Sequence, residues 1–147
     1  MHNAQLGPLI LRAWGPGLAN KSEAYKDWVA HGLMIAGGSD GPISYHAVPI
    51  YEIYGEVTRQ TLWGGSLGPD QGITREQAIR TVTINGAYTT FEENVKGSIE
   101  AGKYADFVVL SGDILTVPAE RIKDLNVRAT VLAGKTVYGD LAKAAGP

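Results

Sequence analysis

The side chains that could do chemistry in this sequence are few and widely spaced. Its three histidines are His2, His31 and His46, and no two of them have the short spacing at which one strand or one helix turn presents a pair of metal ligands. The chain has no cysteine, which excludes a disulfide framework, a thiolate zinc site and a cysteine nucleophile. A local two-histidine metal motif is therefore absent from the sequence.

Asp40 is a carboxylate whose neighbours in the sequence allow a functional or a structural interpretation. It follows Gly37-Gly38-Ser39, and glycines let a backbone pass close to a ligand or through a tight turn. The same pattern is typical of a turn or a helix cap, so the residues alone leave both interpretations open. His46 lies in the same loop and could contact substrate or be a solvated loop histidine. For His31 we expect a structural role at a helix end, where a protonated imidazole is favourable.

Composition and charge narrow the class of protein. The 147 residues suit about one domain, and 44% hydrophobic with 19% charged residues is ordinary globular usage. Thirteen basic and fifteen acidic side chains give a net charge of −2 without a basic run, which argues against nucleic acid and acidic lipid as partners. No apolar run is long enough to span a membrane and no signal peptide is visible, so we expect a cytoplasmic protein.

The first half of the chain predicts alternating helices and a strand. Residues 1–20 are rich in glycine and proline and predict a loop with at most a small strand or turn. A helix is expected after Ser22, the candidate N-cap, and it should end at His31-Gly32. The unbroken apolar run 33–36 is typical of a strand covered on both faces, and another helix should begin at Pro49. This order indicates an α/β unit.

The predicted secondary structure changes from α/β to mainly strands near residues 92–97. Before that point, Thr74 and Gln77 match the capping-box pattern of a helix start, and Asn85-Gly86 is expected to end that helix. Beyond it, three strands are predicted, with Gly134 marking a tight hairpin between the last two: residues 105–110, 126–133 and 135–139.

Two stretches together resemble a known family. They are HGLMIAGGSDGP at residues 31–42, and TINGA at 83–87 followed by KGSIEAGKYADFVVL at 96–110. In this order and spacing they are similar to the amidohydrolase superfamily, in its amidohydrolase-3 branch of metal-dependent hydrolases acting on carbon–nitrogen bonds other than peptide bonds. The resemblance covers about residues 20–140.

The resemblance implies an α/β fold of which this chain is the closing part. Residues 1–92 would be the C-terminal part of the hydrolase barrel, including the last (β/α) unit of a TIM-like barrel. Residues 93–147 would be the C-terminal strands of a small composite β-sandwich. The fold would be incomplete, because the family's H-x-H pair on the first barrel strand and its later histidines have no counterpart here.

The resemblance also assigns chemistry. Asp40 would end the eighth barrel strand, where it would act as the catalytic base and ligate a divalent metal, zinc by expectation, that activates water. His46 would be a substrate-binding residue, and the substrate would be a small amide-like or imide-like molecule. One carboxylate falls short of the roughly three protein ligands of a catalytic zinc, so we do not expect the chain alone to retain the metal.

Three hypotheses follow from an incomplete ligand set. The chain could be an inactive fragment of an amidohydrolase. It could be one part of a split hydrolase whose histidine-bearing strands come from a missing N-terminal portion, another polypeptide or another copy. It could instead be a non-catalytic module that forms a homo-oligomer through exposed β edges, since a partial barrel leaves strands unpaired.

Overall fold

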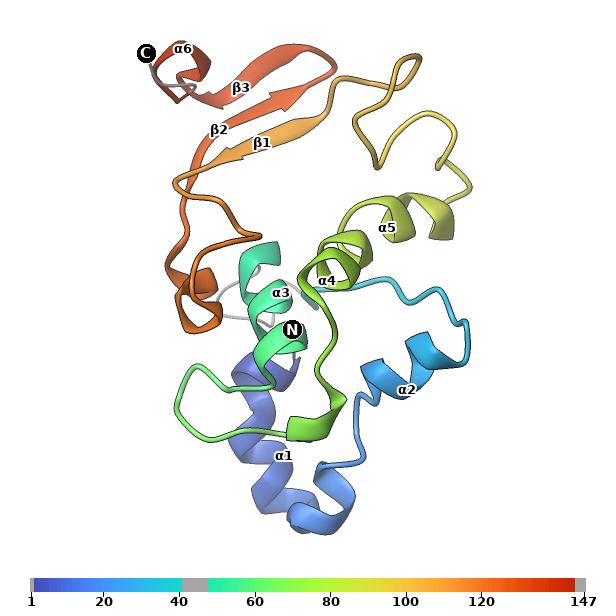
Figure 1. Ribbon diagram of the computed structural model, residues 1–147, viewed down its shortest axis with the longest axis vertical. Helices are drawn as coiled ribbons and strands as arrows, with labels where there is room; N and C mark the ends of the chain where they lie inside the picture. The colour runs from blue at the N-terminus through green and yellow to red at the C-terminus, as the bar shows by residue number, and fades with distance from the viewer. Residues whose placement is uncertain (1, 41–47, 145–147) are drawn as a thin grey trace.

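The computed structural model of the protein describes residues 2–40 and 48–144 (Figure 1). A helical part built from α1 to α5 occupies one end of the molecule, and a small sheet with the C-terminal helix α6 occupies the other. The helices are α1 His2–Ala19, α2 Tyr25–Ala30, α3 Pro49–Thr58, α4 Arg75–Thr81, α5 Ile84–Thr89 and α6 Leu141–Ala144, with 3-10 turns η1 Pro69–Gln71 and η2 Ala119–Asp124.

The helix α1 corrects the prediction of a loop over residues 1–20. It is interrupted at Gly15, where φ is +72°. Pro8 has no N–H for the carbonyl of Ala4 one turn earlier. That carbonyl instead accepts the N–H of Leu62 at 2.7 Å, so a distant loop replaces the missing helical hydrogen bond. Tertiary contacts therefore override the local signals of proline and glycine.

The helix α2 confirms the predicted helix, although its N-cap is Ala24 rather than Ser22. The Ser22 hydroxyl instead donates to the carbonyl of Ala19 at 2.7 Å. The predicted strand at 33–36 is wrong as a description of this structure. Leu33 and Met34 are 57% and 51% exposed, and no strand within the described residues pairs with them. A doubly covered strand needs neighbours on both edges, and within residues 2–40 and 48–144 no strand pairs with this segment.

The core of the helical part surrounds α3. As predicted, Pro49 is the first residue of this helix, where its missing N–H costs nothing. Its apolar face joins a buried cluster with residues of α1, α4 and η2: Ala4, Ile50, Ile53, Tyr54, Ile73, Ala78 and Ile122. Burial of this face against three other elements makes α3 the central helix of the structure.

The start of α4 has the predicted capping box. The Gln77 N–H donates to the Thr74 hydroxyl at 3.2 Å, and the Thr74 N–H donates to the Gln77 side-chain oxygen at 2.9 Å. The predicted end of this helix at Asn85-Gly86 is wrong, because α4 ends at Thr81 and both residues lie inside α5. Asn85 is buried there and uses its side chain in a tertiary hydrogen bond.

The predicted strands are confirmed as a three-stranded antiparallel sheet in the order β1-β2-β3. The strands are β1 Phe107–Leu110, β2 Val127–Leu132 and β3 Lys135–Gly139. Ala133 and Gly134 join β2 to β3 with φ of +47° and +76°, the left-handed pair that a tight hairpin needs. The fold is therefore a mixed arrangement of helices and strands. None of the helices within the described ranges is both long and apolar enough to cross a bilayer.

Replacing Thr74 by alanine tests the capping box. Thr74→Ala removes the acceptor of the Gln77 N–H, so we expect the free energy of unfolding to fall by about 1 kcal/mol in urea denaturation. The control is Thr89→Ala, since the exposed Thr89 hydroxyl only donates back to Gly86 in its own helix. It should change stability by less than about 0.5 kcal/mol. Equal losses in the two variants would contradict the capping role.

Candidate functional site

An extended segment, residues 33–40, is held by helices instead of neighbouring strands. The side-chain amide of Asn85 on α5 donates to the carbonyl of Ile35 at 2.8 Å. The N–H of Gly37 donates to the carbonyl of Thr81, the last residue of α4, at 2.9 Å. The two helices thus fix the path of this backbone.

Asp40 lies at the end of this segment, exposed at the surface. Its φ is +50°, in the left-handed region that few residues other than glycine adopt, although aspartate tolerates it better than most. Such a conformation costs about 1 kcal/mol and is retained where the surroundings hold it, often at functional sites. The carboxylate is therefore in a held backbone conformation and accessible from solvent. Its catalytic and metal-binding roles stay predictions.

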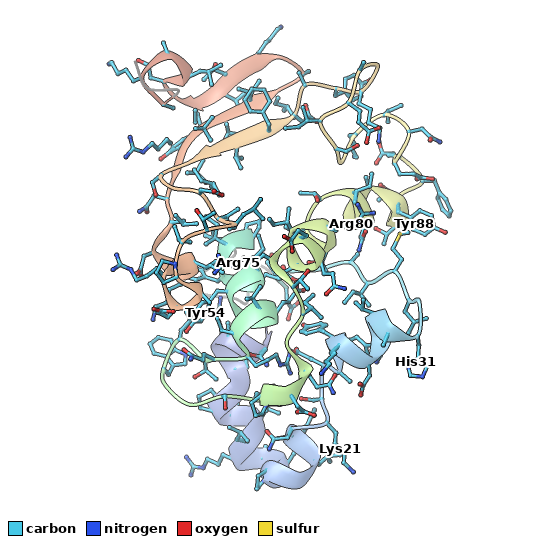
Figure 2. The ribbon with its side chains drawn as sticks, viewed as in Figure 1. Lys21, His31, Tyr54, Arg75, Arg80 and Tyr88 are labelled. Carbon is cyan, nitrogen blue, oxygen red and sulfur yellow. The ribbon has the colours of Figure 1, made fainter. Side chains whose placement is uncertain are left out.

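The histidines do not gather around Asp40 in the part of the chain that is described. His46 lies outside the described residues. His31 points outward at the end of α2 (Figure 2), and its Nδ1 lies 2.7 Å from the carbonyl oxygen of Asp27, in agreement with the predicted helix-end role. Within residues 2–40 and 48–144, no group of three or more His, Cys, Asp or Glu side chains could hold a metal ion.

Two buried carboxylates on α3 are the residues that sequence reasoning missed. Glu52 and Glu56 are only 4% and 1% exposed, one helix turn apart. Burial is the main reason that the pKa of Glu56 is raised to about 8; a hydrogen bond from the Thr81 hydroxyl at 2.9 Å opposes the shift, and the nearby carboxylate of Glu52 adds to it. Two glutamates one turn apart look like an exposed helix face in sequence, so no local signal marks their burial.

Arg59 forms a second buried polar group beyond the end of α3. Its guanidinium Nε donates to the carbonyls of Leu67 and Gly68 at 2.9 and 3.1 Å, and one Nη donates to Ser22 at 3.3 Å. It also lies 5.0 Å from the centroid of the Tyr25 ring. Burial lowers the pKa of Arg59, while the charge of a nearby glutamate opposes that effect. These contacts are structural, because every hydrogen bond named here goes to a backbone carbonyl.

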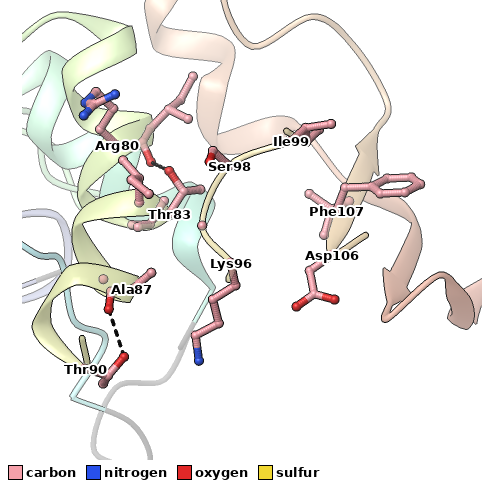
Figure 3. Close-up of a pocket in the computed structure, with 15 residues that line it drawn as sticks. Arg80, Thr83, Ala87, Thr90, Lys96, Ser98, Ile99, Asp106 and Phe107 are labelled. Atoms are coloured by element: carbon pink, nitrogen blue, oxygen red, sulfur yellow. Dashed lines mark hydrogen bonds between the residues drawn. The ribbon is translucent and has the colours of Figure 1, made fainter. Parts of the chain in front are cut away.

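A cavity lies elsewhere, between α4, α5 and β1 (Figure 3). It measures about 730 Å³, and none of residues 33–40 lines it. Two of its charged residues already have partners, since Lys96 pairs with Glu92 at 2.6 Å and Asp106 accepts the N–H of Ala133 at 2.7 Å. Its apolar wall comes from both sides: Ile79, Val82, Ile84, Ile99, Phe107 and Val108. Lys96, Asp106 and the apolar wall residues do not form a catalytic arrangement of acid, base and nucleophile.

Comparison with known proteins identifies the relatives of this chain. The sequence profile of the amidohydrolase family matches residues 1–138. The N-substituted formamide deformylase of Arthrobacter pascens is 33% identical over 107 residues, covering 73% of this chain and 20% of the relative. YtcJ of Bacillus subtilis is 30% identical over 134 residues, covering 89% of this chain and 25% of the relative. The chain thus spans about a quarter or less of these relatives.

A solved structure shows the same fold. An amidohydrolase from Thermotoga maritima superposes with a TM-score of 0.53 at 24% identity, over 76% of this chain and 24% of that chain. The profile match begins at residue 1, so it includes α1, which the sequence resemblance from about residue 20 had left out.

The raised pKa of Glu56 predicts a pH dependence of stability. Its pKa is about 8 in the folded chain against an ordinary 4.5, so between these values the folded state holds a proton that the unfolded state has released. The stabilisation is fully present below about pH 4.5 and is lost as the pH rises toward 8, with a slope of up to about 1.4 kcal/mol per pH unit.

The variant Glu56→Gln, which mimics the protonated side chain, should flatten that slope in urea denaturation at pH 5 to 8. The control is Glu76→Gln, because Glu76 is exposed in the first turn of α4 and its pKa is lowered rather than raised. That variant should keep the wild-type slope. An unchanged slope in Glu56→Gln would show that another group binds the proton.

Proposed function

Because this chain belongs to the amidohydrolase family, we propose that it forms the Asp40-bearing part of a hydrolase acting on carbon–nitrogen bonds other than peptide bonds. The observation that carries the proposal is Asp40 itself, an exposed carboxylate in a left-handed conformation at the end of a segment that two helices hold. The name of the Arthrobacter relative suggests N-substituted formamides as the first substrates to test.

In this proposal Asp40 first accepts a proton from water and then donates it to the leaving nitrogen. Its carboxylate takes a proton from water as the water oxygen bonds to the carbonyl carbon of the substrate. The protonated Asp40 then gives that proton to the nitrogen as the carbon–nitrogen bond breaks, leaving a carboxylic acid and an amine. Exposure at a segment end suits this role, since both water and substrate can reach the carboxylate. His46, which follows Asp40 in the sequence, is proposed to contact the substrate.

The described residues do not by themselves fit the divalent metal that the resemblance implies. A catalytic zinc takes about three protein ligands, and the described part of the chain brings no such group together. The proposed steps above therefore assign nothing to a metal. We propose that the remaining ligands come from polypeptide beyond these 147 residues.

The proposed architecture places residues 1–92 at the closing end of a barrel and residues 93–147 in a small sandwich. The exposed apolar side chains of Leu33 and Met34 support the first part, because an adjoining strand would cover them. The open, exposed strand β3 supports the second. In this arrangement residues 33–40 are the last barrel strand, and its partners are supplied by the rest of the enzyme.

A second candidate function is a non-catalytic module that associates through its sheet. It is favoured by β3, which is exposed throughout, with Val137 and Tyr138 at 59% and 60% exposure. Such edges promote pairing between copies. Under this alternative, light scattering shows a defined dimer that Val137→Lys abolishes, whereas a monomer at high concentration contradicts it.

Asp40→Asn tests the proposed hydrolase. The chain is combined with the histidine-bearing portion of the enzyme, and release of amine from an N-substituted formamide is measured. We expect activity in the mixture and a fall in kcat of about 100-fold or more with Asp40→Asn, since the amide cannot accept the proton. Asp124→Asn, a matched change at an exposed site on η2, should leave kcat unchanged. Full activity in Asp40→Asn would refute the assignment.

A further inference from the structure

A third contact on the segment that leads to Asp40 comes from a buried charged side chain. The N–H of Gly38 donates to Glu52 Oε1 at 2.6 Å. Glu52 is 4% exposed and lies on α3, the central helix of the core. The contact therefore ties the backbone two residues before Asp40 directly to α3 and the buried cluster around it.

We propose that Glu52 is a positioning residue that sets where the Asp40 carboxylate projects. Glu52 acts through the backbone of Gly37 and Gly38 and does not itself touch the reacting atoms. This inference rests on the proposed function in so far as Asp40 is the base, and it adds the residue that holds that base in place.

The fit of Glu52 against Gly37 supports the proposal. A Cβ atom built on Gly37 would overlap Oε1 and Cδ of the Glu52 carboxylate, so the carboxylate would have to shift. A Cβ atom on Gly38 would meet nothing within 4 Å. Glycine at 37 therefore lets the Glu52 carboxylate keep its place, while the open space at 38 makes no such demand.

The strained backbone of Asp40 explains why an anchor is needed. With φ at +50°, Asp40 does not adopt its conformation by preference, and only Ser39 separates it from the anchored Gly38. Releasing Gly38 would let the segment relax and the carboxylate swing. A base displaced by about 1 Å can lose roughly 100-fold in rate while substrate binding is little affected.

Two substitutions of Glu52 test the inference on the hydrolase assembled as described above. Glu52→Ala removes the acceptor, so kcat should fall by about 10- to 100-fold while KM stays within about threefold. Glu52→Gln keeps an oxygen that can accept the Gly38 N–H and should recover most of the lost rate. Partial unfolding would lower the apparent kcat without changing KM, so the folded fraction of each variant is measured by circular dichroism and kcat is expressed per folded molecule.

A matched pair of glycine variants approaches the same contact from the other side. Gly37→Ala pushes the Glu52 carboxylate away and should reproduce the kcat loss of Glu52→Ala. Gly38→Ala makes the same chemical change one residue later, in open space, and should cost much less. Where Glu52→Ala fails to fold, this pair decides the question: equal rates in the two alanine variants overturn the inference.

Amide NMR spectra of the full 147-residue chain separate this inference from the proposed function. In Glu52→Ala and Gly37→Ala, the Gly38 amide should lose its downfield shift and its protection from hydrogen exchange, and the Asp40 amide signal should move or broaden. If the wild-type assembly hydrolyses nothing but these signals change, the proposed function fails and the positioning role stands. If the wild type is active and Glu52→Ala alters neither kcat nor the Asp40 signal, the positioning role is refuted.

Discussion

The structure depends on the burial of three ionisable side chains along α3 and at its end, Glu52, Glu56 and Arg59. Glu52 accepts a hydrogen bond from Gly38, Glu56 accepts one from Thr81, and Arg59 donates to three backbone carbonyls. Burying an ionisable group is costly unless it is hydrogen-bonded or neutralised, so each of these groups constrains the segment that satisfies it. One helix thereby fixes segments that lie far apart in the sequence, and the raised pKa of Glu56 shows the cost at one of them.

The need to satisfy a buried side chain of α3 also helps to explain how residues 33–40 keep a defined path although no described strand pairs with them. A strand normally gains its order from hydrogen bonds to neighbours on both edges. Here the order comes from α3, α4 and α5, through Glu52, the Thr81 carbonyl and the Asn85 side chain. The apolar side chains of Leu33 and Met34 remain exposed, so these hydrogen bonds fix the backbone and leave both side chains at the surface.

Local signals predicted the elements whose determinants are local. The Thr74–Gln77 capping box and the hairpin at Gly134 each depend on residues close in sequence, and both have the expected geometry. The helix α1 could not be predicted in this way, because Leu62, far along the chain, supplies the hydrogen bond that Pro8 cannot make. The unbroken apolar run at 33–36 indicated a covered strand, but periodicity reports what a segment can bury and not whether its partners are present.

The candidate site also combines residues that the local sequence marks with residues that only a tertiary contact reveals. An aspartate after two glycines and a serine is as typical of a turn as of a catalytic base, so Asp40 became a candidate only through the family resemblance. Glu52 had no signal of its own, because its importance lies in a contact across the core. Once that contact is known, the two neighbouring glycines acquire different meanings: Gly37 accommodates the carboxylate, and Gly38 supplies the N–H that binds it. In the proposed arrangement the direction of Asp40 is set through its contact with α3, whereas the described residues bring no set of three metal ligands together around it.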